Sequence, residues 1–209
     1  MIIWGARGLA KEILNNLNAD GLDGGVIFLD NLSTDYDLFL KSNYKILNNL
    51  KYVNTSVEKK ILIGVGGALG RFKISNMISE EGFTEIGYIS ARANIGNLDN
   101  NIHETVTVLS GSTITISVTI GQSCLINKNV IISHDVNVGA FTEISPAVRL
   151  LGGVVVGNFC EIGANATILP KIKIGDHCKI GAGAVVTKNI PDNSVVIGVP
   201  GKIIGLRND

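Results

Sequence analysis

The feature that most constrains the fold is an aliphatic residue at every sixth position of the C-terminal half. Isoleucine, valine or leucine fills each of these positions from Ile102 to Ile180, and Ile89 and Ile95 precede the run, with one extra residue after Ile95. The position two residues earlier is usually small or aliphatic, and the position after is often glycine. A period of six matches neither a helix nor an ordinary alternating strand.

This period predicts a parallel β-helix with three short strands per turn, hence about 18 residues in each coil. Two alternate residues of each strand point inward. Five or six coils, stacked about 4.8 Å apart, make a prism about 25 to 30 Å tall. We expect the glycines to lie at tight corners, because glycine tolerates unusual backbone angles. The β-helix domain is expected to span residues 89–209.

Residues 1–88 follow a different pattern, in which strands alternate with helices. Strands are expected at 1–4, 25–30 and 61–67, helices at 9–17 and about 71–81, and a segment leading out at 84–89. Residues 31–60 are interpreted as loops around one short helix. The pattern predicts a small α/β Rossmann-like domain with a parallel sheet, so the chain as a whole is of mixed class.

Composition narrows the functional classes. The formal net charge of the 209 residues is zero, which gives no basic field for nucleic acid or an anionic membrane. No apolar run approaches the roughly 18 residues of a membrane span, and the start MIIWGARG lacks a signal-peptide pattern. The three cysteines form no ligand motif and are interpreted as buried thiols. We therefore expect a cytoplasmic protein without membrane insertion and without a metal.

The repeat, the turn GARG, and the segments VIFLD, GVGGALGR and IGVPGK together resemble the hexapeptide-repeat, left-handed β-helix acetyltransferases. The resemblance is to bacterial sugar acetyltransferases, which include UDP-4-amino-sugar N-acetyltransferases (bacillosamine and perosamine type) and sialic acid O-acetyltransferases. It implies a left-handed coil, acetyl-CoA as co-substrate, and a homotrimer with the coenzyme between neighbouring prisms. The low share of charged residues, 17%, agrees with surface covered by another subunit. The expected function is acetyl-CoA-dependent N-acetylation of a nucleotide-linked 4-amino sugar in bacterial glycan biosynthesis.

A polar pair, His134 and Asp135, interrupts the apolar rhythm. Ile132 and Val136 are inward positions, so the pair falls at a corner and faces outward. The family that the chain resembles places its catalytic base in this context. Acetyl transfer needs a group that accepts a proton from the attacking nucleophile, and imidazole titrates near neutrality. His134 is therefore expected to be the base, and Asp135 to raise its basicity and fix its tautomer.

Further β-helix site residues come from the resemblance. Asn127 matches a polar position near the acceptor, and a structural corner asparagine is the alternative interpretation. The positions expected to line the coenzyme groove are Glu143, Ala164 and Ala182. Lys188 and Lys202 are placed to meet its phosphates, and solvated surface lysines are the alternative interpretation.

The N-terminal segment GARGLAKE joins a strand to a helix, whose free N–H groups suit a phosphate. The full GxGxxG fingerprint is absent, so a nicotinamide cofactor is not expected. The resemblance favours a nucleotide-sugar diphosphate instead. The expected substrate-binding residues are Arg7, Gly8, Leu9, Asp30, Asn31 and Gly66. A structural glycine turn and a capping aspartate are the alternatives.

Two other functions remain open. O-acetylation of a sialic acid-type sugar would use the same base. A non-catalytic β-helix scaffold would not need the displayed pair of His134 and Asp135. A carbonic-anhydrase-like zinc site is disfavoured, because His103, His134 and His177 lie on distant coils.

Overall fold

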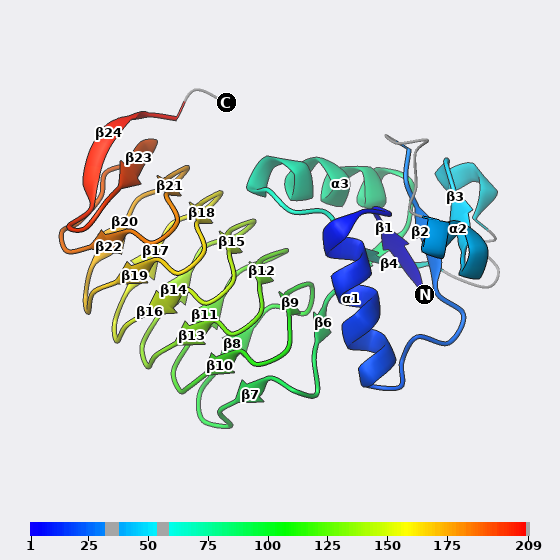
Figure 1. Cartoon of the computed structure of the whole chain (residues 1–209), viewed down its shortest axis with the longest axis horizontal. Coiled ribbons are helices and arrows are strands. Elements are labelled where there is room, and N and C mark those ends of the chain that lie inside the picture. Colours follow the sequence, from blue (N-terminus) through cyan, green and yellow to red (C-terminus); the bar gives the residue numbers. More distant parts are fainter. Residues whose placement is uncertain (32–37, 54–58, 208–209) are drawn as a thin grey trace.

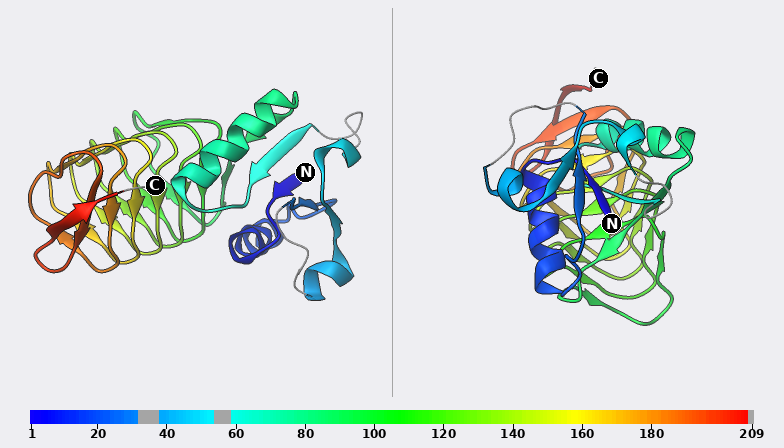
Figure 2. Two further views of the ribbon diagram at one scale, coloured as in Figure 1. Left: turned by 90° about the horizontal axis from the view of Figure 1, so that it is seen from above. Right: turned by 90° about the vertical axis from the view of Figure 1, so that its right-hand side faces the viewer.

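The computed structural model describes residues 1–31, 38–53 and 59–207, arranged as two halves that lie end to end (Figures 1 and 2). The N-terminal half contains helices α1 (Gly8–Ala19), α2 (Leu38–Asn43) and α3 (Ala68–Glu80) and the short 3₁₀ helix η1 (Leu50–Tyr52). Its parallel sheet has the strand order β3-β2-β1-β4-β5. The strands are β1 (Ile2–Trp4), β2 (Ile27–Leu29), β3 (Lys45–Leu47), β4 (Lys60–Ile63) and β5 (Thr84–Ile86).

Helices cover both faces of this sheet, which explains why the central strand β1 and its neighbour β2 are apolar throughout. The buried residues of α1, among them Ile13 and Leu17, pack against Phe28 on one face, and Ile74 and Ile78 of α3 pack on the other. The expected short helix is present as α2, but the loop interpretation of residues 31–60 misses the edge strand β3. Residues 32–37 and 54–58 of that expectation lie outside the described residues.

The C-terminal half is a parallel β-helix built from three sheets. The eight-stranded sheet holds β6 (Tyr88–Ile89), β9 (Thr107–Val108), β12 (Leu125–Ile126), β15 (Glu143–Ile144), β18 (Glu161–Ile162), β21 (Lys179–Ile180), β23 (Ser194–Ile197) and β24 (Lys202–Leu206). The six-stranded sheet holds β7 (Asn94–Ile95), β10 (Thr113–Ile114), β13 (Ile131–Ile132), β16 (Arg149–Leu150), β19 (Thr167–Ile168) and β22 (Val185–Val186). The five-stranded sheet holds β8 (Asn101–Ile102), β11 (Thr119–Ile120), β14 (Asn137–Val138), β17 (Val155–Val156) and β20 (Lys173–Ile174).

The strand register confirms the predicted coil length. Thr113 pairs with Ile131, 18 residues later, and Ile131 pairs with Arg149 after the same interval. The first coil is one residue longer, since Asn94 pairs with Thr113, and this accounts for the extra residue in the repeat.

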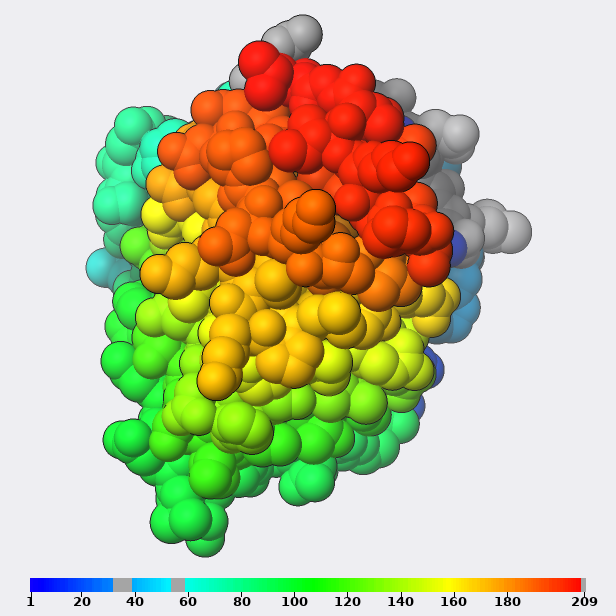
Figure 3. Space-filling view, turned by 90° about the vertical axis from the view of Figure 1, so that its left-hand side faces the viewer, coloured from blue at the N-terminus to red at the C-terminus, as the bar shows by residue number. Residues whose placement is uncertain are grey.

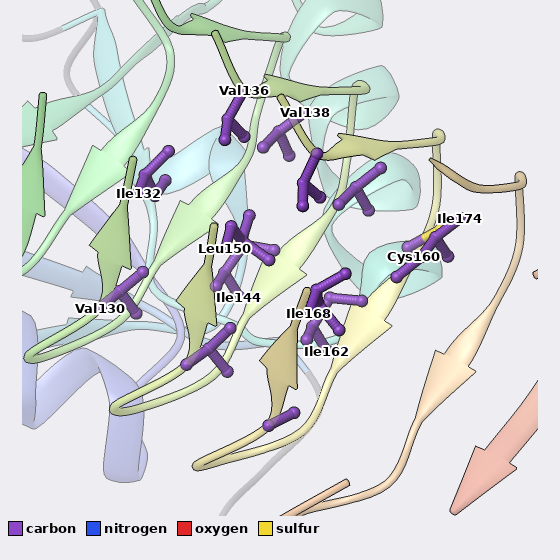
Figure 4. Packing of buried hydrophobic residues seen from close by; sticks show 14 of the residues in the cluster. Val130, Ile132, Val136, Val138, Ile144, Leu150, Cys160, Ile162, Ile168 and Ile174 are labelled. Carbon is purple, nitrogen blue, oxygen red and sulfur yellow. The ribbon is translucent and has the colours of Figure 1, made fainter. Parts of the chain in front are cut away.

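The repeated aliphatic side chains stack inside the prism (Figure 4). Those from Val108 to Ile180 are buried, whereas Ile102 is only partly buried. Ile89, on the end strand β6, is 45% exposed because no coil precedes it. Cys124, Cys160 and Cys178 are buried, unpaired thiols.

The expectation that glycines supply unusual backbone angles at the corners holds for Gly111, Gly153 and Gly183 but is wrong for the glycines that directly follow an inward aliphatic residue. A Cβ on Gly139 would lie 2.6 Å from the backbone nitrogen of Asn158, and one on Gly163 would lie equally close to that of Ala182. These glycines are needed because the next coil approaches so closely. Positive φ angles fall instead on the third residue after most inward aliphatic residues, where Gly111, Gly153 and Gly183 adopt them alongside a larger number of non-glycine residues. These include Asn129, Asp135, Phe141, Ala147, Phe159, Asn165, Lys171 and His177.

Helix α3 joins the two halves through a buried arginine. Arg71 is fully buried, and its Nε donates to the carbonyl oxygen of Ser123 in the β-helix at 2.7 Å. Its Nη1 donates to the carbonyl oxygens of Ile63 and Val65, at the end of β4, at 3.3 and 3.0 Å. One guanidinium thus ties three backbone carbonyls of both halves together.

An aromatic stack forms a second joint. Phe141, Phe159 and His177 occupy one corner of three successive coils, and their rings stack with centroids 5.4 and 4.9 Å apart. Phe72 of α3 meets Phe141 and Phe159 edge-on at 5.2 and 5.4 Å. The stack therefore gives α3 a flat apolar surface on which to pack.

The carboxylate of Asp20 links helix α1 to the start of the β-helix. Asp20, at the C-terminal end of α1, accepts hydrogen bonds from the hydroxyl of Tyr88, the hydroxyl of Ser90 (3.1 Å) and the backbone nitrogen of Ala91 (2.9 Å). The hydrogen bond from Tyr88 is the largest cause that lowers the pKa of Asp20. The first coil is thereby fastened to α1.

The chain ends by folding back along the prism. The hairpin of β23 and β24 lies at one side of the C-terminal end of the prism, and residues of the last coils remain visible beside it (Figure 3). Beyond it, Arg207 donates from Nη1 to the carbonyl oxygen of Phe159 at 3.1 Å and from Nη2 to Glu161 Oε1 at 2.9 Å. The tail therefore reaches coils that precede it by more than forty residues.

Candidate active site

His134 and Asp135 lie at the corner between β13 and β14, as expected. The backbone of Asp135 has a φ of 60°, and its Oδ2 lies 2.7 Å from Nδ1 of His134. Both side chains are exposed, at 63% and 65%. Because the carboxylate engages Nδ1, Nε2 is the nitrogen left to accept a proton from a substrate.

Backbone hydrogen bonds hold this corner between its neighbours. Asp135 N donates to the carbonyl oxygen of Ile116 at 3.2 Å, and Gly153 N donates to that of His134 at 2.9 Å. The imidazole lies against Gly152, since a Cβ there would be 2.6 Å from Nε2. Gly152 lies one coil length after His134, and this spacing is the only sequence signal that points to it.

A cavity of about 350 Å³ lies at the carboxyl ends of β1, β2 and β4. Parallel α/β sheets bind ligands at this edge. The cavity brings together the predicted residues Arg7, Leu9, Asp30, Asn31 and Gly66. The sequence analysis missed Trp4, Gly5, Ala6, Gly64 and Val65 of its lining. Their position in the sequence could have indicated them, because each of these residues ends or closely follows strand β1 or β4.

Asp30 already has a structural partner in this cavity. It is buried, and its Oδ2 accepts a hydrogen bond from the backbone nitrogen of Ala6 at 3.2 Å. This bond is not a helix cap, because Ala6 precedes Arg7, the N-cap of α1, and α1 has no side-chain cap.

Gly8 does not line this cavity. It lines a separate hollow beside α1, together with Lys11, Glu12 and Lys128. A Cβ on Gly8 would meet no atom within 4 Å. Its expected role in substrate binding remains a prediction.

The structure places Glu143 at the junction of the two halves. Its Oε2 accepts a hydrogen bond from the backbone nitrogen of Gly67, the N-cap of α3, at 2.6 Å. A Cβ on Gly66 would lie 3.0 Å from the same oxygen. Glu143 lines a hollow of about 230 Å³ at this junction, together with Gly67, Glu161 and Lys179. Its expected coenzyme contact remains a prediction.

Ala164 and Ala182 do lie together. They occupy the same corner in successive coils, where Gly183 N donates to the carbonyl oxygen of Ala164 at 2.8 Å. Small side chains leave the backbone of this corner accessible. Lys188 and Lys202 are exposed near the last coil.

Asn127 is buried at the end of β12. Its Oδ1 accepts a hydrogen bond from the backbone nitrogen of Lys128 at 2.8 Å. Lys128 in turn pairs with Glu12 of α1 at 2.8 Å. These contacts fit the structural interpretation, and the structure does not bring Asn127 to the corner that carries His134.

The cavity and the imidazole lie on different sides of the prism. Helices α1 and α3 contact the eight-stranded sheet and its two corners, through Ser110 and Lys128 on one side and Phe141 on the other. His134 occupies the third corner, between the six-stranded and five-stranded sheets. Within one chain the two parts of the expected site therefore do not meet.

The remaining histidines make structural contacts. His103 Nδ1 lies 2.9 Å from Thr105 Oγ1, and the ring of His177 stacks on Phe159. Among the described residues, no group of three or more His, Cys, Asp or Glu side chains could hold a metal ion. None of the helices in the described ranges has the length and apolar character needed to cross a membrane.

Comparisons with known proteins agree with the repeat. The bacterial transferase hexapeptide (six repeats) family matches residues 153–188. A sequence comparison with curated proteins finds no significant match.

Several solved structures share the fold over nearly the whole chain. A mutant of perosamine N-acetyltransferase from Caulobacter crescentus, in complex with CoA and GDP-perosamine, has a TM-score of 0.89 and 28% identity, covering 98% of this chain and 96% of that one. The acetyltransferase domain of PglB from Neisseria gonorrhoeae, with acetyl coenzyme A, has a TM-score of 0.87 and 24% identity, with 97% and 98% covered. WeeI from Acinetobacter baumannii has a TM-score of 0.88 and 22% identity over the same shares.

The parallel sheets and the hexapeptide repeat fit a left-handed β-helix acetyltransferase. The resemblance of this chain to the hexapeptide-repeat sugar N-acetyltransferases, expected from its sequence, is thereby confirmed.

Proposed function

We propose that this protein transfers the acetyl group of acetyl-CoA to the amine of a nucleotide-linked 4-amino sugar. The observation that carries the proposal is the exposed pair of His134 and Asp135, with Nδ1 and Oδ2 2.7 Å apart. The likeness to perosamine N-acetyltransferase in complex with CoA and GDP-perosamine supports the same substrate classes.

In this proposal His134 is the general base. As the amine attacks the thioester carbonyl carbon, Nε2 accepts the proton that the nitrogen loses, and the C–S bond breaks to release the thiol of coenzyme A. Asp135 holds the ring through Nδ1 and stabilises the imidazolium that forms. The proton then passes to the departing sulfur, which restores the free imidazole.

Residues 1–88 form the Rossmann-like nucleotide-binding domain in this proposal, and residues 89–209 form the acyltransferase domain. The cavity at the carboxyl ends of β1, β2 and β4 supports this division. Arg7 and the free N–H groups at the start of α1 provide positive charge for a diphosphate. Ala164 and Ala182 leave a corner along which a pantetheine chain can run.

We further propose a homotrimer in which one chain supplies the nucleotide pocket and its neighbour supplies His134. The support is geometric, since the two parts lie on different sides of the prism within one chain. A second copy can bring the exposed corner of His134 to the pocket. Light scattering should give three times 22.1 kDa, and a monomer at micromolar concentration would contradict this part.

Mixed assemblies test the shared site directly. His134→Ala removes the base, and Asn31→Trp fills the nucleotide cavity at an exposed residue of its lining. Each variant alone should lose about 10²-fold or more of the wild-type activity. Co-expressed in equal amounts, they should regain roughly a quarter of the wild-type activity, because random assembly pairs two intact half-sites that often. No recovery in assemblies shown to be mixed would place both half-sites in one chain.

A substrate panel tests the reaction itself. Release of coenzyme A should be measured with UDP-, GDP- and dTDP-linked 4-amino sugars and with CMP-sialic acid, with His134→Ala as the control. We expect turnover of at least one amino sugar by the wild type and a rate about 10²–10⁴-fold lower by the control. Turnover of CMP-sialic acid alone would favour O-acetylation, and no turnover with any acceptor would favour a scaffold.

A further inference from the structure

The glycine next to the imidazole is not required by the backbone of its corner. Residues 98, 116, 134, 152 and 170 follow one another along one edge, as the hydrogen bonds from Asp135, Gly153 and Lys171 to the preceding coil show. The other members of this column are Leu98, Ile116, His134 and Pro170, all of which carry side chains. The φ angle of Gly152 lies outside the left-handed region. Neither sequence position nor backbone conformation explains this glycine.

What the glycine does provide is space for the base. A Cβ at position 152 would lie 2.6 Å from Nε2 and 2.7 Å from Cε1 of His134. At Gly139, by contrast, the obstructing atom is a backbone nitrogen of the next coil. Among the described residues, the only atoms within 3 Å of a Cβ at 152 thus belong to an exposed imidazole, which can turn away.

We propose that Gly152 is a positioning residue for His134, and the proposal rests on the function proposed above. By having no side chain, it lets the ring keep its hydrogen bond to Asp135 while Nε2 remains directed toward a substrate. A methyl group at 152 would occupy the space of the nitrogen that must accept the proton. The ring would rotate, and the bond between Nδ1 and Asp135 would be lost or lengthened.

The decisive variant is Gly152→Ala. Its melting temperature should be equal to or slightly above that of the wild type, because alanine restricts the unfolded chain and meets no backbone atom. Its kcat should fall by about 10²-fold, the usual effect of a misplaced general base. The KM values for both substrates should change little.

Gly153→Asn is the matched control. Gly153 is the adjacent residue of the same corner and has a φ of 70°, the conformation that Asn129 and Asn165 adopt in other coils. Its Cβ would meet Lys171 Cγ at 3.5 Å, which is an ordinary contact, and not the imidazole. We expect this variant to retain wild-type kcat.

Two readouts separate positioning from simple obstruction. In a His134→Ala background, Gly152→Ala should have no further effect on kcat, because it acts only through the ring. In ¹⁵N-NMR spectra without substrate, it should shift the resonances of the His134 imidazole, whereas Gly153→Asn should not.

A raised KM, or a loss of kcat that persists without His134, would mean that residue 152 meets the substrate and would overturn the proposal. Unchanged imidazole resonances would overturn it as well. Because the NMR measurement needs no turnover, it decides the role of Gly152 even if the wild type proves to have no acetyltransferase activity.

Discussion

Replacing Arg71 by methionine should loosen the junction between the two halves. Methionine keeps much of the buried volume but donates no hydrogen bond, so the carbonyl oxygens of Ser123, Ile63 and Val65 lose their side-chain donor. A buried polar group left unpaired costs about 1–3 kcal/mol. Part of this loss is offset, because the variant also removes a buried charge whose Nη2 has no partner in the described structure.

The expected net loss is about 3 kcal/mol of unfolding free energy. For a chain of this size that corresponds to a fall in melting temperature of about 6–12 °C. The single tryptophan, Trp4, is buried in the N-terminal sheet, so its fluorescence reports that half. Circular dichroism at the strand wavelength reports mainly the β-helix.

Urea titrations should be followed by both signals. We expect the fluorescence midpoint of Arg71→Met to fall more than the circular dichroism midpoint, because the β-helix keeps its own coil contacts. Arg149→Met, at an exposed arginine on β16, is the control and should change neither. A loss below about 1 kcal/mol would refute the reasoning, since it would mean that the three carbonyls find other donors at little cost.

Three further outcomes can be checked with the same protein. His134→Ala should lose about 10²–10⁴-fold in kcat, and Asp135→Asn should lose less, because the carboxylate orients the base and does not itself take the proton. Steady-state kinetics measures both losses, with circular dichroism as a folding control. A larger loss for Asp135→Asn would reverse the two roles. The hydrogen bond from Tyr88 lowers the pKa of Asp20, so this carboxylate stabilises the fold above its unfolded pKa and loses that contribution as the pH falls through 3.8 and below. The urea midpoint of Asp20→Asn should accordingly lie below that of the wild type at pH 7 and approach it at pH 3, and a constant difference would show that titration is not involved. Phe72→Ala removes the edge-on contact with the aromatic stack and should lower the free energy of unfolding by about 2–3 kcal/mol. This is less than the loss for a fully buried phenylalanine, because Phe72 is 36% exposed. A fall in melting temperature of less than 2 °C per expected kcal/mol would contradict this estimate.

The β-helix was predictable because every coil needs aliphatic side chains at the same inward positions. Each inward side chain fills the same space in its coil, so the six-residue aliphatic period recurs many times along the sequence. The period would remain recognisable even if one position departed from it. The role of the glycines was not predictable in this way. A glycine that adopts a positive φ, such as Gly153, and a glycine that the next coil approaches closely, such as Gly139, are the same letter in the sequence, and only the stacked coils distinguish them.

The site was predictable where chemistry or strand position marks a residue. His134 and Asp135 stand out in an apolar run, and Asp30 ends a strand. Arg71 could not be identified, because a charged residue in a helix is ordinarily exposed and its three acceptors are backbone atoms. The contact of Glu143 with Gly67 depends on how the halves meet, and no local pattern encodes that.

The returning tail makes the protein sensitive to its own number of coils. Arg207 reaches Phe159 and Glu161 only because a fixed number of strands lies between them and the hairpin. A duplicated coil after residue 171 would preserve every corner and every inward contact, but it would carry the tail about 4.8 Å further along the prism. Arg207 would then lie beside a different coil, out of reach of its present hydrogen-bond acceptors. The contacts of Arg207 with Phe159 and Glu161 therefore form only with the present number of coils, and a chain that gained a whole coil would lose them.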